Sequence, residues 1–162
     1  MTVSELQFTF PDATEETWHQ HFNGGGWVQN TATVDDTAFV GPDAVVSGDA
    51  RVSSEAMVSG NAMVSGNARV SGDALVSGNA VVYGNARVSG NAQVFGYASV
   101  SGEARVSGIA RVYGDALVSG NALVHGNARV SGNADVSGYA RVAGNADVSG
   151  DDVVSDNIRV LW

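Results

Sequence analysis

Valine recurs at every sixth position from Val28 to Val160 without exception, and this repeat constrains the fold more than any other feature of the chain. An alanine follows four residues after each valine from Ala32 to Ala146, and a glycine lies two residues after most of these valines. The unit Val-Ser-Gly-Asn/Asp-Ala-x matches neither the 3.6-residue period of a helix nor the simple alternation of a long strand. An internal repeat of this length predicts a solenoid, and a hexapeptide unit indicates a parallel β-helix.

Each unit combines a short strand with a tight corner. The valine and the alanine two positions before it point the same way along a strand, because strand side chains alternate, and we expect both to face the core. The residues on either side of each valine then point outward. Gly-Asn or Gly-Asp supplies the positive φ that a sharp corner needs, and small alanines let the walls of a narrow prism approach each other.

The outward residue before each valine indicates how many units make one coil. With three units per coil, residues 18 positions apart lie on top of one another, and this spacing separates the outward residues into three columns of different character. The columns read Thr33, Arg51, Arg69, Arg87, Arg105, Leu123, Arg141, Arg159; Phe39, Met57, Leu75, Gln93, Arg111, Arg129, Asp147; and Trp27, Val45, Met63, Val81, Ser99, Leu117, Asp135, Val153. We therefore predict an all-β triangular solenoid of about seven coils, with coils about 4.8 Å apart.

The repeat Val-Ser-Gly-Asn-Ala-Arg resembles the hexapeptide repeat of left-handed parallel β-helix proteins, over residues 28–160. The resemblance implies a left-handed coil built from three hexapeptides, a handedness that the composition does not show and that opposes the usual right-handed crossover. Gly25-Gly26-Trp27-Val28 also resembles uncharacterised bacterial and phage hexapeptide-repeat proteins that are often labelled acyltransferases. Many proteins of this superfamily are trimers.

Residues 1–26 lack the repeat and are predicted to form a capping or assembly element, with the β-helix over 27–162. Gln7–Phe10 alternates polar and apolar residues, which predicts a short strand. Asp12 and Glu15 fit a capping box, which predicts a helix over residues 13–22. On that helix Trp18 and Phe22 lie four residues apart and share a face, which we expect to pack on the first coil.

The composition excludes several classes of function. The chain has no cysteine, so it has no disulfide and no thiolate site, and its eight basic residues are all arginines. A net charge of −9 argues against sequence-independent binding to nucleic acid or anionic lipid. The sequence shows no membrane-spanning stretch and no signal-peptide pattern, and we expect a cytoplasmic or virion-associated protein.

Apolar residues form outward stripes in the N-terminal half of two columns. Stripes of this size indicate an interface, so we predict self-association as a dimer or trimer, or binding of a protein partner. Residues 1–26 can cover one of the two stripes within the chain, but a short element can hardly cover both. The predicted self-association residues are Trp27, Val45, Met63 and Val81 in one stripe and Phe39, Met57 and Leu75 in the other.

An aromatic patch follows on the second column. Phe95 and Tyr113 occupy equivalent positions one coil apart and are predicted to stack on adjacent coils, near Tyr97, Arg111 and Arg129. Aromatic residues beside arginine are typical of binding hot spots and of platforms that stack sugars. The alternative is a cross-strand aromatic pair that serves stability alone.

The arginine column also has two interpretations. It can be a ladder for an anionic partner such as a phosphate, a sulfate or a polyanion. Alternatively it is a solvated face, on which arginine stems cover valine-rich strands while the guanidinium groups reach corner acids such as Asp49 and Glu103. The net charge favours the second interpretation.

Catalysis is not expected. The hexapeptide run has no loop insertion that could enclose a substrate, and His125 only replaces a serine in an outward column. His19 and His21 fall on different faces of the predicted helix, so we expect no metal site, no cofactor and no catalytic residue. The alternative function is an acyltransferase-like enzyme with His125 as its base.

Overall fold

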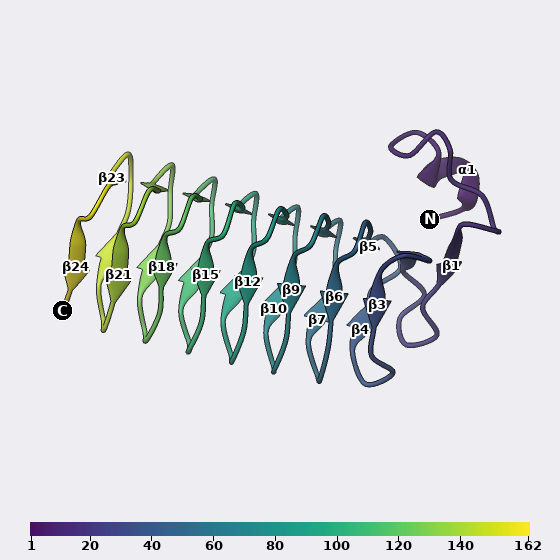
Figure 1. The fold of residues 1–162 in the computed structure, drawn as a ribbon, viewed down its shortest axis with the longest axis horizontal. Coiled ribbons are helices and arrows are strands. Elements are labelled where there is room, and N and C mark those ends of the chain that lie inside the picture. Colours follow the sequence, from purple (N-terminus) through teal and green to yellow (C-terminus); the bar gives the residue numbers. More distant parts are fainter.

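The computed structural model describes residues 1–162 and is an all-β parallel solenoid with an 18-residue spacing, the architecture that the sequence predicts, with about eight coils where the sequence predicted about seven (Figure 1). Its strands form three sheets that run the length of the rod, and each coil contributes one short strand to each sheet. The only helix is α1 (Val3–Leu6), in the N-terminal segment. No helix has the length and apolarity needed to cross a membrane.

We name the three sheets A, B and C. Sheet A contains β1 (Trp18–Gln20), β2 (Trp27–Gln29), β5 (Val45–Val46), β8 (Met63–Val64), β11 (Val81–Val82), β14 (Ser99–Val100), β17 (Leu117–Val118), β20 (Asp135–Val136) and β23 (Val153–Val154). Sheet B contains β3 (Thr33–Val34), β6 (Arg51–Val52), β9 (Arg69–Val70), β12 (Arg87–Val88), β15 (Arg105–Val106), β18 (Leu123–Val124), β21 (Arg141–Ala143) and β24 (Arg159–Leu161). Sheet C contains β4 (Phe39–Val40), β7 (Met57–Val58), β10 (Leu75–Val76), β13 (Gln93–Val94), β16 (Arg111–Val112), β19 (Arg129–Val130) and β22 (Asp147–Val148).

Strand pairing confirms that residues 18 positions apart are neighbours. Arg87 pairs in parallel with Arg69 on one side and with Arg105 on the other, and the same step relates the coils of sheets A and C. The three columns of outward residues predicted from the sequence are therefore confirmed, and each column lies on one sheet. The handedness of the coil stays a prediction, because parallel pairing in this register is the same for either hand.

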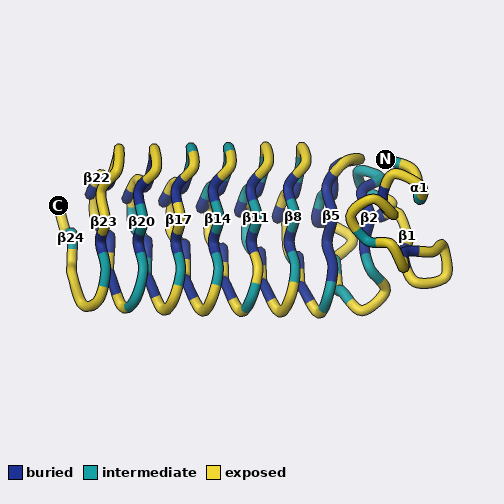
Figure 2. Tube along the Cα trace, turned by 90° about the horizontal axis from the view of Figure 1, so that it is seen from above, coloured by how far each residue is buried: buried dark blue, intermediate teal, exposed yellow.

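The core is a single column of valines and alanines along the axis of the rod. Every repeat alanine from Ala38 to Ala146 is buried, and the repeat valines from Val40 to Val142 have no exposed surface. Forty buried residues form this one cluster, while most of the residues between them are half-buried or exposed (Figure 2). The inward and outward assignment made from strand alternation is confirmed.

The corners depend on glycine for two reasons. Gly96 has a φ of +74°, a left-handed conformation that glycine adopts without steric cost. A Cβ on Gly96 would also lie 3.0 Å from the backbone nitrogen and oxygen of Gly114 in the next coil. Ser54 and Asp156 occupy the same corner position with φ values of 61° and 59°, so two coils carry a side chain where the repeat calls for glycine.

The N-terminal segment differs from the sequence prediction. Residues 7–10 do not form a strand: Thr2 and Glu5 make a reciprocal capping box that starts α1, and turns follow it. The Glu5 carboxylate accepts the backbone N–H of Thr2, and this hydrogen bond lowers the pKa of Glu5. The predicted capping box at Asp12 and Glu15 is absent.

The predicted helix over residues 13–22 is also wrong. This stretch contains turns and strand β1, which pairs antiparallel with β2 and covers the first edge of sheet A. An unpaired strand edge offers backbone groups that compete with local helix formation. Trp18 lies on β1, whereas Phe22 lies in the turn that follows this strand, so the two side chains do not share a helix face. Trp18 is 4% exposed, whereas Phe22 is 74% exposed.

The covering segment has a small core of its own. Leu6, Ala13 and Trp18 pack with Trp27 and Val45 of sheet A, and Met63 lies against the same cluster. The Trp27 indole nitrogen donates a hydrogen bond to the Met1 carbonyl at 2.9 Å. The two ends of the covering segment are therefore both fixed to the first coils.

The buried column predicts a sharp difference between neighbouring positions on β13. Val94→Asp places an unpaired carboxylate in the apolar core and should lower the free energy of unfolding by about 3 kcal/mol or more. Gln93→Asp adds the same group to the outer face of that strand and should change stability by less than about 1 kcal/mol. Urea unfolding followed by circular dichroism measures both values. Equal losses would contradict the assigned core.

The corner geometry predicts opposite effects for a matched pair of substitutions. Gly96→Ala should destabilise the protein by about 1–2 kcal/mol, because it adds a Cβ at positive φ against the next coil. Ser54→Gly should raise the melting temperature, because it relieves the same conformation. Differential scanning calorimetry of the two variants checks the signs, and a stabilised Gly96→Ala would refute this account of the corner.

Candidate functional site

Sheet C brings the predicted aromatic patch together. Phe95 and Tyr113 follow β13 and β16 at equivalent positions, and their rings stack with centroids 5.0 Å apart and an interplanar angle of 1°. The neighbouring strands hold both rings in register. The stack is the one predicted, and both side chains remain partly accessible.

The predicted basic residues lie beside this stack. Arg111 and Arg129 pair in register on β16 and β19, and both are exposed. Arg111 on β16 and Tyr113 directly after this strand flank the inward Val112, so both point outward. Tyr97 lies at the corner after β13 and is 67% exposed.

One of the two predicted apolar stripes continues the same surface. Phe39, Met57 and Leu75 stand in consecutive coils of sheet C, in register with Gln93 and then with the arginine pair. Met57 is 43% exposed, and its two neighbours are partly buried. We name the outer surface formed by Phe39, Met57, Leu75, Phe95, Tyr97, Arg111, Tyr113 and Arg129 the aromatic face. The sequence analysis places the apolar residues and the aromatic patch on the same column, and the structure shows them on one sheet.

The other predicted stripe is not an open surface. Trp27 and Val45 on sheet A are buried beneath residues of the N-terminal segment, and Met63 is half-buried against them. Only Val81 of the four predicted residues lies beyond this cover. For Trp27 and Val45 the expectation of an exposed self-association stripe is therefore wrong, because residues of the N-terminal segment cover both side chains. This is the alternative, cover within one chain, that the sequence left open.

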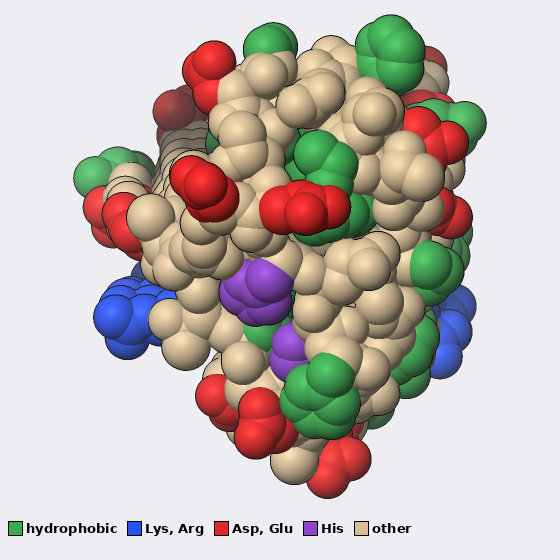
Figure 3. Space-filling view, turned by 90° about the vertical axis from the view of Figure 1, so that its right-hand side faces the viewer, with side chains coloured by type: hydrophobic (Ala, Val, Ile, Leu, Met, Phe, Trp, Pro, Cys, Tyr) green, Lys and Arg blue, Asp and Glu red, His purple; other side chains and the backbone are tan.

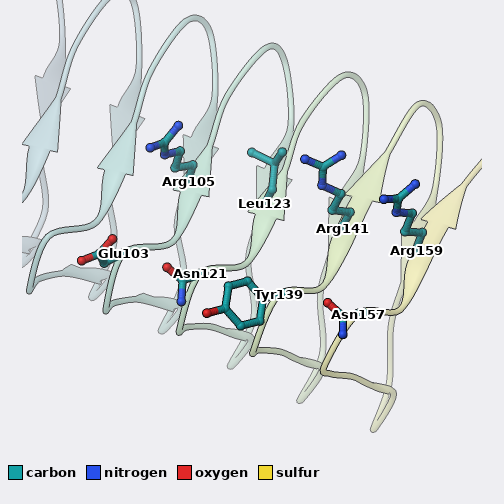
Figure 4. A pocket seen from close by; sticks show the side chains of 8 residues that line it. All are labelled: Glu103, Arg105, Asn121, Leu123, Tyr139, Arg141, Asn157 and Arg159. Carbon is teal, nitrogen blue, oxygen red and sulfur yellow. The ribbon is translucent and has the colours of Figure 1, made fainter.

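Sheet B carries a groove that the sequence only partly indicates. Its outward column is the predicted arginine column, and a second row of side chains stands at the corner that precedes each strand (Figure 4). A depression of about 370 Å³ lies between the two rows, and a second of about 280 Å³ adjoins it. We name this surface the arginine groove; its residues are Asn67, Arg69, Asn85, Arg87, Glu103, Arg105, Asn121, Leu123, Tyr139, Arg141, Asn157 and Arg159.

The arginines of sheet B have no partners within the protein. The only ion pair in the structure joins the Met1 ammonium to Asp43 at 3.3 Å, and no guanidinium group donates a hydrogen bond. The interpretation in which these side chains reach Asp49 and Glu103 is therefore not what the structure shows. Four arginines in consecutive coils instead stand next to one another at the spacing of β-strands, which is unfavourable for like charges.

The corner asparagines of the groove are also free. Elsewhere asparagine side chains bond to their neighbours in the next coil, as in Asn127 to Asn145 at 3.1 Å and Asn61 to Asn79 at 3.2 Å. No side-chain hydrogen bond engages Asn67, Asn85, Asn121 or Asn157. The sequence analysis missed this row, although the coil-to-coil spacing of the corner residues would have predicted it.

The histidines occupy ordinary structural positions. His21 is buried and donates to the Ala38 carbonyl at 3.0 Å, and His19 donates to the Asn30 side-chain oxygen at 2.8 Å. His125 is half-buried beside sheet B and makes no side-chain hydrogen bond that would orient its ring. No group of three or more potential metal ligands is present.

The fold and these faces define the protein as a β-solenoid repeat protein with three long lateral surfaces. The family model described as the YdcK β-solenoid repeat matches residues 56–72, 68–84, 82–96 and 110–126. Each matched span corresponds to about one coil in the middle of the rod. No curated protein and no solved structure matches the chain.

The unpaired arginine column predicts that a single charge reversal stabilises the protein. Arg87→Glu places a carboxylate between Arg69 and Arg105, and replacing two like-charge contacts by two opposite-charge contacts should raise the free energy of unfolding by about 0.2–1 kcal/mol. The gain should shrink in about 1 M salt, which screens exposed charges. Urea titrations at low and high salt measure it, and a loss of stability at low salt would contradict an unpaired column.

Proposed function

We propose that this protein is a non-catalytic binding rod that uses its aromatic face to associate with copies of itself or with a protein partner. The observation that carries the proposal is the stacked pair Phe95–Tyr113, which lies on one sheet with an apolar column and an exposed arginine pair. Aromatic residues and arginine are the residue types that contribute most to the centres of protein interfaces.

The rigidity of the rod supports this role. β13 and β16, which precede Phe95 and Tyr113, each have a hydrogen-bonded strand on both sides, and the two rings already contact each other before a partner arrives. A preorganised surface loses little conformational freedom on binding. Burial of its apolar part would contribute about 25 cal/mol per Å² before those costs.

The wider setting follows from the repeat. We propose that the chain belongs to the hexapeptide-repeat superfamily, with a left-handed coil, and that it forms a dimer or trimer or is a structural component of a bacterial or phage assembly. The match to a β-solenoid repeat model supports the assignment to β-solenoid repeat proteins. The regular hexapeptide pattern supports the superfamily, and the long lateral faces support the role in an assembly.

A non-catalytic role is supported by the shape of the molecule. No inserted loop interrupts the coils from β2 to β24, so no lid encloses a substrate, and the surface depressions on sheets B and C lie on open faces. His125 lacks the hydrogen-bonded carboxylate that would orient a catalytic base. The acyltransferase-like alternative has no feature of the structure in its favour.

Charging the apolar column of the aromatic face tests the proposal. Met57→Glu with Leu75→Glu adds two carboxylates to adjacent strands of sheet C and should lower the molecular mass in solution, because the charges would have to be desolvated in the interface. Light scattering over a range of protein concentrations measures the mass, and Phe95→Ala with Tyr113→Ala should shift it in the same direction.

The matched control adds the same charge to another sheet. Leu117→Glu with Val153→Glu alters two exposed residues of sheet A and should leave the mass unchanged. A wild-type protein that is monomeric at high concentration, or an equal loss of mass in the control, would reject self-association through the aromatic face.

A further inference from the structure

The arginine groove is one continuous track. The depression of about 280 Å³ and the depression of about 370 Å³ share Glu103 and Arg105. Side chains that line two depressions at once connect them. A chain-like ligand could therefore lie along the rod, across many coils.

The local charge of this track differs from that of the whole protein. Residues 46–146 contain seven arginines and six acidic residues, whereas residues 1–45 contain seven acidic residues and no arginine. In the view onto the N-terminal end, acidic side chains spread across the near end and the arginines lie on two flanks behind it (Figure 3). The net charge of −9 is thus concentrated at the ends. Charges more than about 8 Å apart are largely screened at physiological salt.

The chemistry of the two rows specifies the ligand. A guanidinium group binds a carboxylate through two parallel hydrogen bonds, and the arginine row repeats at the strand spacing of about 4.8 Å. The free asparagine amides opposite offer both donors and acceptors, which suit hydroxyl groups. Tyr139 adds an aromatic ring in the same groove. Carboxylates, hydroxyls and a face for stacking occur together in an acidic sugar.

Two interruptions of the rows exclude a more densely charged ligand. Glu103 stands between two depressions and would repel a polymer with a charge on every unit, yet it accepts hydrogen bonds from hydroxyls. Leu123 breaks the arginine column after four consecutive members. Single-stranded nucleic acid also needs aromatic platforms for several successive bases, and the groove has one aromatic ring, that of Tyr139.

We propose that the arginine groove binds a carboxylated polysaccharide, a polymer that contains uronic acid units, along the axis of the rod. The arginines hold the carboxylates, and the asparagine row orients the sugar hydroxyls. This site lies on a different sheet from the aromatic face and goes beyond the proposed function. It also accounts for a column of like charges that costs stability and has no partner within the chain.

Binding of fluorescently labelled, partly methyl-esterified polygalacturonate, followed by anisotropy at about 50 mM and 200 mM salt, tests the proposal. The wild-type protein should bind saturably and lose affinity as salt rises, and neutral dextran should not bind. Arg69→Gln with Arg87→Gln should weaken binding at least about tenfold, since hydrogen bonds to charged groups are lost from both strands.

The chain provides a matched control for this variant. Leu117→Glu with Val153→Glu makes the same change in net charge at two exposed positions of sheet A, outside both the arginine groove and the aromatic face. It should change the affinity by less than about twofold if the groove, and not the overall charge, recognises the sugar. Circular dichroism verifies that both variants are folded.

Three results would overturn the proposal. The first is the absence of saturable binding at low salt, and the second is an equal loss of affinity in the two double variants. The third is tighter binding of poly(dT), polyphosphate or poly-aspartate, which would assign the groove to a nucleic acid, a phosphate polymer or an acidic peptide.

Discussion

The hydrogen bonding of each coil to the next, in one register that never changes along the rod, is the constraint on which the rest of the structure depends. Arg51 donates from its backbone to Ala68 at 2.9 Å, and the equivalent bond recurs from coil to coil along sheet B. The corners approach so closely that glycine stacks on glycine, with no room for a Cβ between them. The buried valines and alanines fill a prism whose width these bonds and corners set.

The same constraint determines how side chains are presented to solvent. A residue on the outside has its two nearest outward neighbours one coil away on either side, so chemical character accumulates in columns. On sheet C this produces a stacked aromatic pair beside an apolar column. On sheet B it produces an arginine column that the protein does not neutralise. The aromatic pair stabilises the protein on its own, whereas the adjacent like charges of the arginine column destabilise it. The two faces therefore imply different ligands, an apolar protein surface for sheet C and an anion for sheet B.

The sequence predicted what the repeat determines. The core positions, the three columns and the Phe95–Tyr113 stack all follow from three hexapeptides per coil, which is local information. The N-terminal segment was predicted wrongly because its conformation depends on the exposed edge of β2, which is not visible in the local pattern that suggested a helix. For the same reason the sequence did not decide whether residues 1–26 cover Trp27 and Val45. The sequence also could not show that Asp49 and Glu103 form no ion pairs, because their positions two residues before Arg51 and Arg105 put them within reach of a guanidinium group.

The three-sheet coil also sets a rule for how such a gene can change in length. Inserting or deleting one hexapeptide would preserve the inward valines and the corner glycines, yet it would turn every later column onto the next sheet. The arginines beyond the change would leave the groove and join another face. Only a change of three hexapeptides together lengthens or shortens the rod while keeping each face continuous. Length variation among related rods should therefore occur in steps of a whole coil wherever a lateral face is under selection.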